Sequence, residues 1–159
     1  MQTILQQRVA ALGLILPQPA PPAANYIPAK EGSGLLFIAG QIPQRNGQAC
    51  YIGRVGQEIT VADAQDAAGL CALQILAQVD AVMALAPSGR AVCMRIGGFV
   101  RCREDFTDIP IVMNGASDLL VAALGADGKH ARTAVGVGAL PRGVAVEVDA
   151  VFALYPEAS

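Results

Sequence analysis

The stretch ARTAVGVGALPRGVAVEVDAVFALY, residues 131–155, carries the clearest β-pattern in the chain. It predicts one strand from about Arg132, a turn over 140–143, and a second strand from 144 onward that pairs with the first. One face of the second strand would be apolar, with Val144, Val146, Val148, Ala150, Phe152 and Leu154. The opposite face would be mixed, with Glu147, Asp149, Val151, Ala153 and Tyr155. Such a face suits a sheet that closes against copies of itself, where acids meet arginines of a neighbour.

Two helices are expected on either side of another strand. Thr60 is a suitable N-cap for a helix over residues 61–85, whose apolar residues recur three or four positions apart. The second helix should cover residues 110–124, because a proline opens this segment and a glycine follows it. Between them, residues 91–101 indicate a strand in which Gly97–Gly98 permits a bulge or a close backbone approach.

The N-terminal third predicts smaller elements. A short helix is expected within residues 3–14, followed by an extended proline-rich connector over 17–24. Residues 35–38 (LLFI) predict a buried strand, and Asn46–Gly47 predicts a hairpin turn. The order helix, strands, helix, strand, helix, strands is typical of an α+β layer of helices over one sheet.

Composition fits one compact domain over residues 24–159, preceded by the helix and connector of residues 1–23. A chain of 159 residues that is 53% hydrophobic and 15% charged can bury a core without disulfides. The net charge of −2 and the pI of about 5.3 disfavour nucleic acid as a partner. A mean hydropathy of +0.45 favours a homo-oligomer, because subunit contacts hide apolar surface.

Cysteine spacing and apolar runs bear on metals and location. Cys50, Cys71, Cys93 and Cys102 lack the close spacing of zinc and redox motifs, so no metal is expected. The apolar run at 9–16 lacks the charged start of a secretion signal, and a cytoplasmic location follows as the expectation. The uncharged run at 67–79 is shorter than the ~20 residues that cross a bilayer, so no membrane span is expected.

Arg132 is the first candidate site residue. Small residues would follow it on the same face of the strand and leave space for a ligand: Ala134, Gly136 and Gly138. A guanidinium in such a cleft is a bidentate receptor for a carboxylate. The alternative is an interface ion pair with Glu147 or Asp149. Glu147 could orient Arg132 or place a water by accepting its proton, or could be only a structural partner of that arginine.

Three polar residues near Arg132 have a plainer interpretation. His130 is the only histidine and would point the same way as Arg132, but it lacks the partners of a triad or a metal centre. This pattern favours a residue at the rim. Asn114 and Ser117 lie near the start of the second helix, where local capping is the favoured interpretation over a role in a site.

Three segments together resemble one known family, the Rid proteins (reactive intermediate deaminases), also called the YjgF or L-PSP endoribonuclease family. They are Tyr26 followed by GLLFIAGQIP (34–43), FVRCREDF (99–106) ahead of the helix with Asn114, and ARTAVGVGALPRGVAVEVDAV (131–151). The last segment is the most specific, because its arginine, Leu–Pro turn and VEVDA strand recur in the same register. The likeness covers about residues 24–155, and residues 1–23 and the longer stretch near ALGADGKH resemble the extended branch of the family, of roughly 150 residues.

The resemblance implies a chorismate-mutase-like α+β fold and a homotrimer with three clefts between subunits. It implies hydrolysis of reactive enamines and imines, such as 2-aminoacrylate, to 2-keto acids and ammonia without a cofactor. By the same resemblance Arg132 would bind the substrate carboxylate and Glu147 would position the water. Tyr26 and Asn114 would line the cleft.

The sequence departs from the family pattern at two positions of this implied site. The usual serine before the Gly40 position is Ala39, and the residue two after the arginine, often cysteine, is Ala134. Ala39, Gly40 and Ala134 would therefore contact the substrate through backbone amides. The missing hydroxyl leaves the identity of the substrate open.

Two other function classes stay open from the sequence. A trimer that uses Arg132 to bind a small imino or keto acid without turnover would need the same cleft. A single-strand endoribonuclease is less favoured, because the chain has an acidic pI and no tryptophan for a stacking platform. A purely structural or chaperone-like role is the fourth interpretation.

Overall fold

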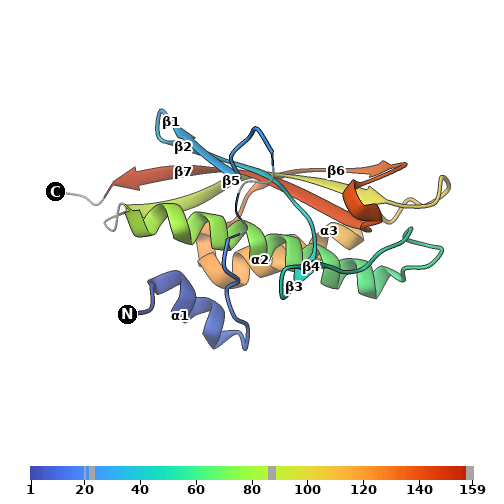
Figure 1. Ribbon diagram of the computed structural model, residues 1–159, viewed down its shortest axis with the longest axis horizontal. Helices are drawn as coiled ribbons and strands as arrows, with labels where there is room; N and C mark the ends of the chain where they lie inside the picture. Colours follow the sequence, from blue (N-terminus) through green and yellow to red (C-terminus); the bar gives the residue numbers. More distant parts are fainter. Residues whose placement is uncertain (20, 22–23, 86–88, 157–159) are drawn as a thin grey trace.

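The computed structural model describes residues 1–19, 21, 24–85 and 89–156. A five-stranded sheet in the order β1-β2-β7-β5-β6 forms one layer, and helices α2 and α3 cover one of its faces (Figure 1). The strands are β1 (Ala29–Gly32), β2 (Leu35–Gln41), β5 (Gly89–Arg101), β6 (Ala131–Val137) and β7 (Val146–Pro156). A separate pair, β3 (Gln44–Arg45) and β4 (Gln48–Ala49), completes the strands. The expected α+β architecture is confirmed.

The helices begin and end where the sequence predicts. Helix α2 (Val61–Leu85) starts after Thr60, whose Oγ1 accepts a hydrogen bond from the backbone N–H of Asp63 at 3.1 Å. Helix α3 (Ile109–Leu124) has Pro110 in its first turn and Gly125 after its end. Helix α1 (Ile4–Ala11) lies outside α2 and α3, and short 3₁₀ turns follow as η1 (Gly125–Gly128) and η2 (Pro141–Gly143).

Glycines set how closely α3 approaches its neighbours. The Cα of Gly115 lies against the backbone carbonyl of Gln65 on α2, where a Cβ would overlap it. The Cα of Gly98 on β5 lies against the side chain of Met113 in the same way. The first contact brings α3 close to α2, and the second brings the first half of α3 close to the sheet. Gly98 thus confirms the expected close approach, whereas the irregularity of β5 lies between Cys93 and Arg95.

The last two strands do not pair with each other, so that part of the prediction was wrong. β6 runs parallel to β5, while β7 lies between β5 and β2 and is antiparallel to both. The backbone N–H of Arg101 donates to the carbonyl of Ala145 at 2.8 Å, so the segment that follows η2 bonds to the end of β5. The strand with the more apolar inner face occupies the centre of the sheet, and glycine-containing β6 remains at the edge.

The N-terminal third differs from expectation in two places. β1 was not predicted; it pairs with β2 through a turn at Ser33 and Gly34, which both have positive φ. β2 is only half buried, because Leu36 and Ile38 face the helices while Leu35 and Phe37 face away. The Asn46–Gly47 turn between β3 and β4 is confirmed. Part of the expected connector, at residues 20 and 22–23, lies outside the described residues.

Two helical segments, α2 and the stretch Ile109–Gly128 that joins α3 to η1, are long and apolar enough to cross a bilayer by length and composition alone. In the fold they form the layer beneath the sheet, and 61% of the apolar stretch of α2 is buried there. The expectation that no segment spans a membrane rested on a shorter run than the helix actually has. Packing against the sheet accounts for the apolar character of α2.

Candidate functional site

Arg132 lies on edge strand β6, and its side chain reaches over the N-terminal half of α3. Nη1 donates to Asn114 Oδ1 at 3.0 Å and to Ser117 Oγ at 3.1 Å, and Nη2 donates to the carbonyl of Pro110 at 3.2 Å. All three acceptors are neutral. Among the ion pairs found in the described part of the chain none involves Arg132, which is half-buried. The guanidinium is thus held by dipoles, with its charge available to a ligand.

The strand register places Arg132 on the helix side of the sheet. It lies opposite Ile96 of β5, which lies opposite Ala150 of β7. Both neighbours are buried beneath the helices. Cross-strand neighbours share a face, so the side chains of Ala150, Ile96 and Arg132 all point toward the helices. Arg132 is the last of these three, at the edge of the sheet.

Glu147 belongs to the opposite face. It lies across from Phe99, which pairs with Val135, a residue that is 40% exposed on the uncovered side of the sheet. Its carboxylate lies against the Cα of Gly40, where no Cβ could fit. Burial, followed by the nearby charge of Asp149, raises the pKa of Glu147 above its ordinary value of 4.5.

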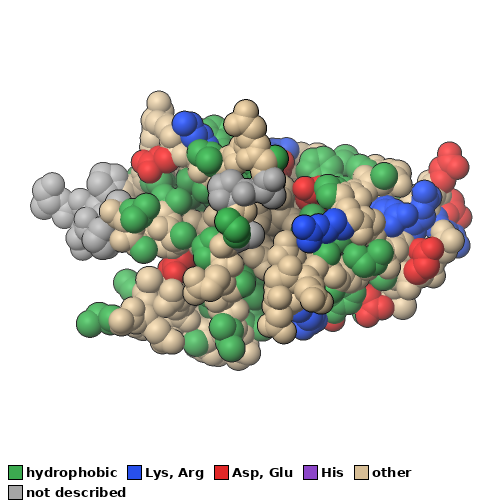
Figure 2. Space-filling model, viewed as in Figure 1, with side chains coloured by type: hydrophobic (Ala, Val, Ile, Leu, Met, Phe, Trp, Pro, Cys, Tyr) green, Lys and Arg blue, Asp and Glu red, His purple; other side chains and the backbone are tan. Residues whose placement is uncertain are grey.

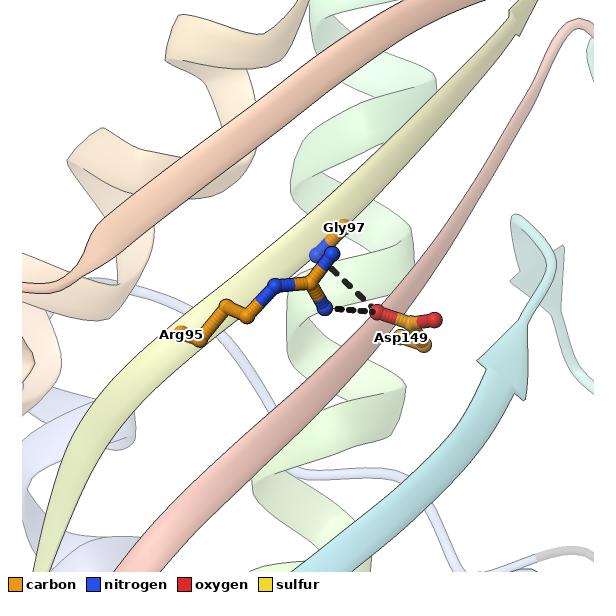
Figure 3. Close-up of polar contacts among 3 residues, drawn as sticks. All are labelled: Arg95, Gly97 and Asp149. Carbon is orange, nitrogen blue, oxygen red and sulfur yellow. Dashed lines mark hydrogen bonds and ion pairs between the residues drawn. The ribbon is translucent and has the colours of Figure 1, made fainter.

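The alternative partner for Arg132, Asp149, is engaged elsewhere. Its Oδ1 accepts from the backbone N–H of Gly97 at 2.9 Å and pairs with Arg95 Nη1 at 3.4 Å (Figure 3). In the same view α2 lies behind the sheet, so this pair sits on the uncovered face. Within one chain the ion pair of Arg132 with Glu147 or Asp149 is therefore not formed, because those acids face the other way.

The remaining candidates fall into two groups. Ala134 shares the helix-side face with Arg132, and Gly40 shares the uncovered side with Glu147. The N–H of Ala39 donates to the carbonyl of Pro28 at 2.9 Å, so that amide is not free for a substrate. Tyr26 lies just ahead of β1 with 55% of its surface exposed. One chain thus brings Arg132, Asn114 and Ala134 together, and does not bring Glu147 to them.

Two functional candidates were undervalued in the sequence. Ser117 and His130, expected to be a capping residue and a rim residue, both contact the Arg132 cluster. The signal was present in the spacing, since Asn114 and Ser117 lie three apart on one helix face and His130 precedes Arg132 by two. The space beyond Ala134 is narrower than expected, because Cys102 and Ile109 lie beside Gly136.

Comparison with known proteins decides the family. The family model described as "YjgF/chorismate_mutase-like, putative endoribonuclease" matches residues 6–152. The chain belongs to this family. Protein TCP17 of Trypanosoma cruzi is 40% identical to this YjgF-family chain over 159 residues, covering 97% of this chain and 99% of its own length.

Solved structures agree with this assignment to the YjgF family. Atu1372 of Agrobacterium tumefaciens, a protein of unknown function, matches with a TM-score of 0.86 and 39% identity, covering 95% of this chain and 92% of its own. A "putative endoribonuclease" of Shewanella oneidensis MR-1 matches with a TM-score of 0.87 and 27% identity over 96% of this chain and 99% of its own. The expected chorismate-mutase-like α+β fold is confirmed. No group of three or more metal-binding side chains occurs within the part of the chain that the structure describes.

Proposed function

We propose that this chain hydrolyses small reactive enamines and imines, of the 2-aminoacrylate type, to 2-keto acids and ammonia. The observation that carries the proposal is the state of Arg132. Arg132 is half-buried, and its guanidinium is oriented by three neutral acceptors and has no carboxylate partner among the described residues. A cation in that state is suited to grip a small carboxylate through its planar fork.

The reaction asks little of the protein beyond positioning. A protonated imine is already electrophilic, so a fixed substrate and one oriented water remove most of the barrier. Water adds to the imine carbon while the carboxylate of Glu147 accepts one of its protons. That proton then moves to the amino nitrogen and the C–N bond breaks, so ammonia leaves. The new hydroxyl group gives its remaining proton to the Glu147 carboxylate and becomes the keto oxygen, and the proton passes on to the released ammonia. An enamine such as 2-aminoacrylate first takes up a proton at its methylene carbon, which gives the iminium form. The raised pKa of Glu147 makes its carboxylate a stronger base than an exposed one.

Assembly of identical chains is part of the proposal. Because Arg132 and Glu147 lie on opposite faces of one sheet, the uncovered face of a neighbour has to supply the glutamate. The uncovered face carries apolar side chains that solvent does not favour, including Leu35, Phe37 and Val135. We propose a homotrimer with a cleft at each subunit contact, working in the cytoplasm, where the four free cysteines would stay reduced.

Replacing Arg132 tests the proposal. Arg132→Ala and Arg132→Lys should each lower kcat/KM for imine hydrolysis by about 100-fold or more, because a lysine keeps the charge but not the fork. Ammonia release from 2-aminoacrylate generated in the assay is the measurement. Arg8→Ala, an exposed arginine on α1, is the matched control and should leave the rate unchanged. An Arg132→Ala protein that keeps the assembled mass and hydrolyses imines at the parent rate would overturn the assignment.

The same proteins separate the other function classes. Pyruvate binding without ammonia release would favour the non-catalytic carboxylate-binding trimer. If the Arg132→Ala protein still cleaves single-stranded RNA, a ribonuclease function is favoured, the activity given in the description of the Shewanella relative. On the face that Figure 2 shows, Lys and Arg side chains lie among Asp and Glu side chains, which argues against a polyanion groove there.

A further inference from the structure

Behind Arg132 lies a linear chain of hydrogen bonds that the proposed reaction does not use. Ser117 Oγ is 3.1 Å from Arg132 Nη1 and 2.9 Å from His130 Nε2. His130 Nδ1 is 2.6 Å from the carbonyl oxygen of Gly128, in η1. This hydrogen-bond chain therefore runs from a guanidinium through a hydroxyl and an imidazole to a backbone carbonyl.

The two ends determine the direction of every bond between them. A carbonyl oxygen only accepts, so Nδ1 of His130 carries the hydrogen. Nε2 of the neutral ring is then an acceptor, and the Ser117 hydroxyl donates to it. Because that hydroxyl donates its one hydrogen to His130, its lone pairs are left to accept from Arg132, which only donates. Of the two tautomers of the neutral His130 ring, only the Nδ1–H form satisfies all three contacts.

The hydroxyl of Ser117 has no role within its own helix. Ser117 lies in the middle of α3 rather than at its N-cap, and its described hydrogen bonds go to Arg132 and His130. The favoured sequence interpretation, local capping, is therefore wrong for Ser117. Its hydroxyl acts as a bridge between two segments of the chain.

The hydrogen bonds to Arg132 also determine which part of its guanidinium faces a ligand. Asn114 and Ser117 take both hydrogens of Nη1, and Pro110 takes one of Nη2. Of the five N–H donors of an arginine, those left are the one on Nε and one on Nη2. A carboxylate approaching this side meets a fork whose plane is already set.

We propose that Ser117 and His130 are positioning residues that hold the Arg132 guanidinium in the plane needed to bind the substrate carboxylate. This inference rests on the proposed function of Arg132. His130 acts only through Ser117, by keeping the hydroxyl lone pairs turned toward Nη1. Neither side chain touches the reacting atoms.

Binding of pyruvate, the keto acid that 2-aminoacrylate yields, tests the inference apart from catalysis. Ser117→Ala and His130→Phe should each raise the Kd of pyruvate by calorimetry, and the KM for the imine, about tenfold, with kcat changed less than about threefold. Ser117→Thr keeps the hydroxyl and His130→Gln keeps an acceptor, so both should bind within about twofold of the parent. Asp118→Ala, an exposed neighbour on α3, is the matched control.

A double variant identifies the order of the chain. Because His130 works through Ser117, adding His130→Phe to Ser117→Ala should weaken pyruvate binding no further, whereas independent roles would multiply the two effects. Nitrogen NMR of the only histidine should show hydrogen on Nδ1 and none on Nε2 at neutral pH. An Nε2–H ring, or multiplied effects, would overturn the inference.

The outcomes distinguish the positioning role of Ser117 and His130 from the proposed deaminase function. Normal pyruvate binding by Ser117→Ala, with imine hydrolysis by the parent, overturns the positioning role and leaves the deaminase proposal standing. Binding that depends on Ser117 without turnover supports the positioning role and overturns the deaminase proposal. A parent protein that neither binds pyruvate nor hydrolyses imines overturns both.

Discussion

Two charged side chains of the candidate site, Arg132 and Glu147, lie in opposite surroundings. Arg132 is bonded to three neutral acceptors, so its charge is oriented but not neutralised. Glu147 is half buried against Gly40, where burial disfavours the charged carboxylate. Both groups are therefore kept in a state that a solvated surface residue would not hold, and such states are typical of functional sites.

The raised pKa of Glu147 predicts a pH-dependent stability. Between the ordinary value of 4.5 and the raised native value, the folded protein binds more protons than the unfolded chain, so the free energy of unfolding falls as pH rises. Glu147→Gln should therefore raise the free energy of unfolding at pH 7 by up to about 1 kcal/mol, because solvent partly screens this half-exposed group. The gain should vanish near pH 3.5.

Urea unfolding at the two pH values measures this difference. Glu31→Gln, at an exposed position on β1, is the control and should change stability at neither pH. For the separated chain, to which the prediction applies, a Glu147→Gln protein less stable than the parent at pH 7 would contradict it, since the charged carboxylate would then have a favourable partner within its own chain.

Helix α1 is attached to the rest of the fold by polar contacts with one carboxylate as well as by apolar packing. The buried carboxylate of Asp80 on α2 accepts from the Thr3 hydroxyl and from Gln6 Nε2, the latter at 2.9 Å. Val9 is the buried residue of α1, and a cavity of about 440 Å³ remains between α1 and the ends of α2 and β5. Leu5 also packs against the core, so the Asp80 carboxylate supplies the polar part of the docking of α1 and the apolar contacts supply the rest.

Removing the Asp80 carboxylate should release α1. Asp80→Ala leaves the hydroxyl of Thr3 and the amide of Gln6 without their acceptor, at a cost of about 1–3 kcal/mol. Amide exchange in residues 4–11 should become fast while the sheet stays protected, as hydrogen–deuterium exchange would show. Asp66→Ala, an exposed acid on the same helix, is the control. Unchanged protection of α1 in Asp80→Ala would show that apolar contact alone holds it.

At the scale of the whole molecule, one face of the sheet is covered by helices and the other is not. Phe37 is 49% exposed on the uncovered face, and Val151 lies opposite it on β7. Length and composition predict that such apolar area is shared between chains. The proposed cleft needs the same contact, because it has to bring a neighbour's Glu147 to Arg132.

A charge on that face should break the assembly. Phe37→Glu would bury an unpaired carboxylate between subunits, a cost of several kcal/mol, so the protein should run as a monomer by light scattering at micromolar concentration. Imine hydrolysis should be lost with it. Val121→Glu places the same charge on the exposed side of α3 and should leave the mass unchanged. An assembled Phe37→Glu protein would show that subunits meet elsewhere.

Local signals in the sequence determined most elements of the fold. Thr60 with Asp63, Pro110, Gly125 and Asn46–Gly47 act within a few residues of themselves, so caps and turns could be predicted without knowledge of the rest of the chain. Alternation over residues 144–152 likewise marked the buried face of β7 correctly. The motif around Arg132 also indicated the family.

Only the tertiary structure decided which strands pair and which polar groups meet. The hairpin expected between β6 and β7 did not form, because pairing depends on which strand buries the larger apolar face between two neighbours. That arrangement turned Glu147 away from Arg132 and left Asp149 to Arg95. The contacts of Ser117 and His130 with Arg132 depend on how closely α3 approaches β6. That approach depends on contacts with segments distant in sequence, Gly98 with Met113 and Gly115 with Gln65, so no local pattern could have shown it.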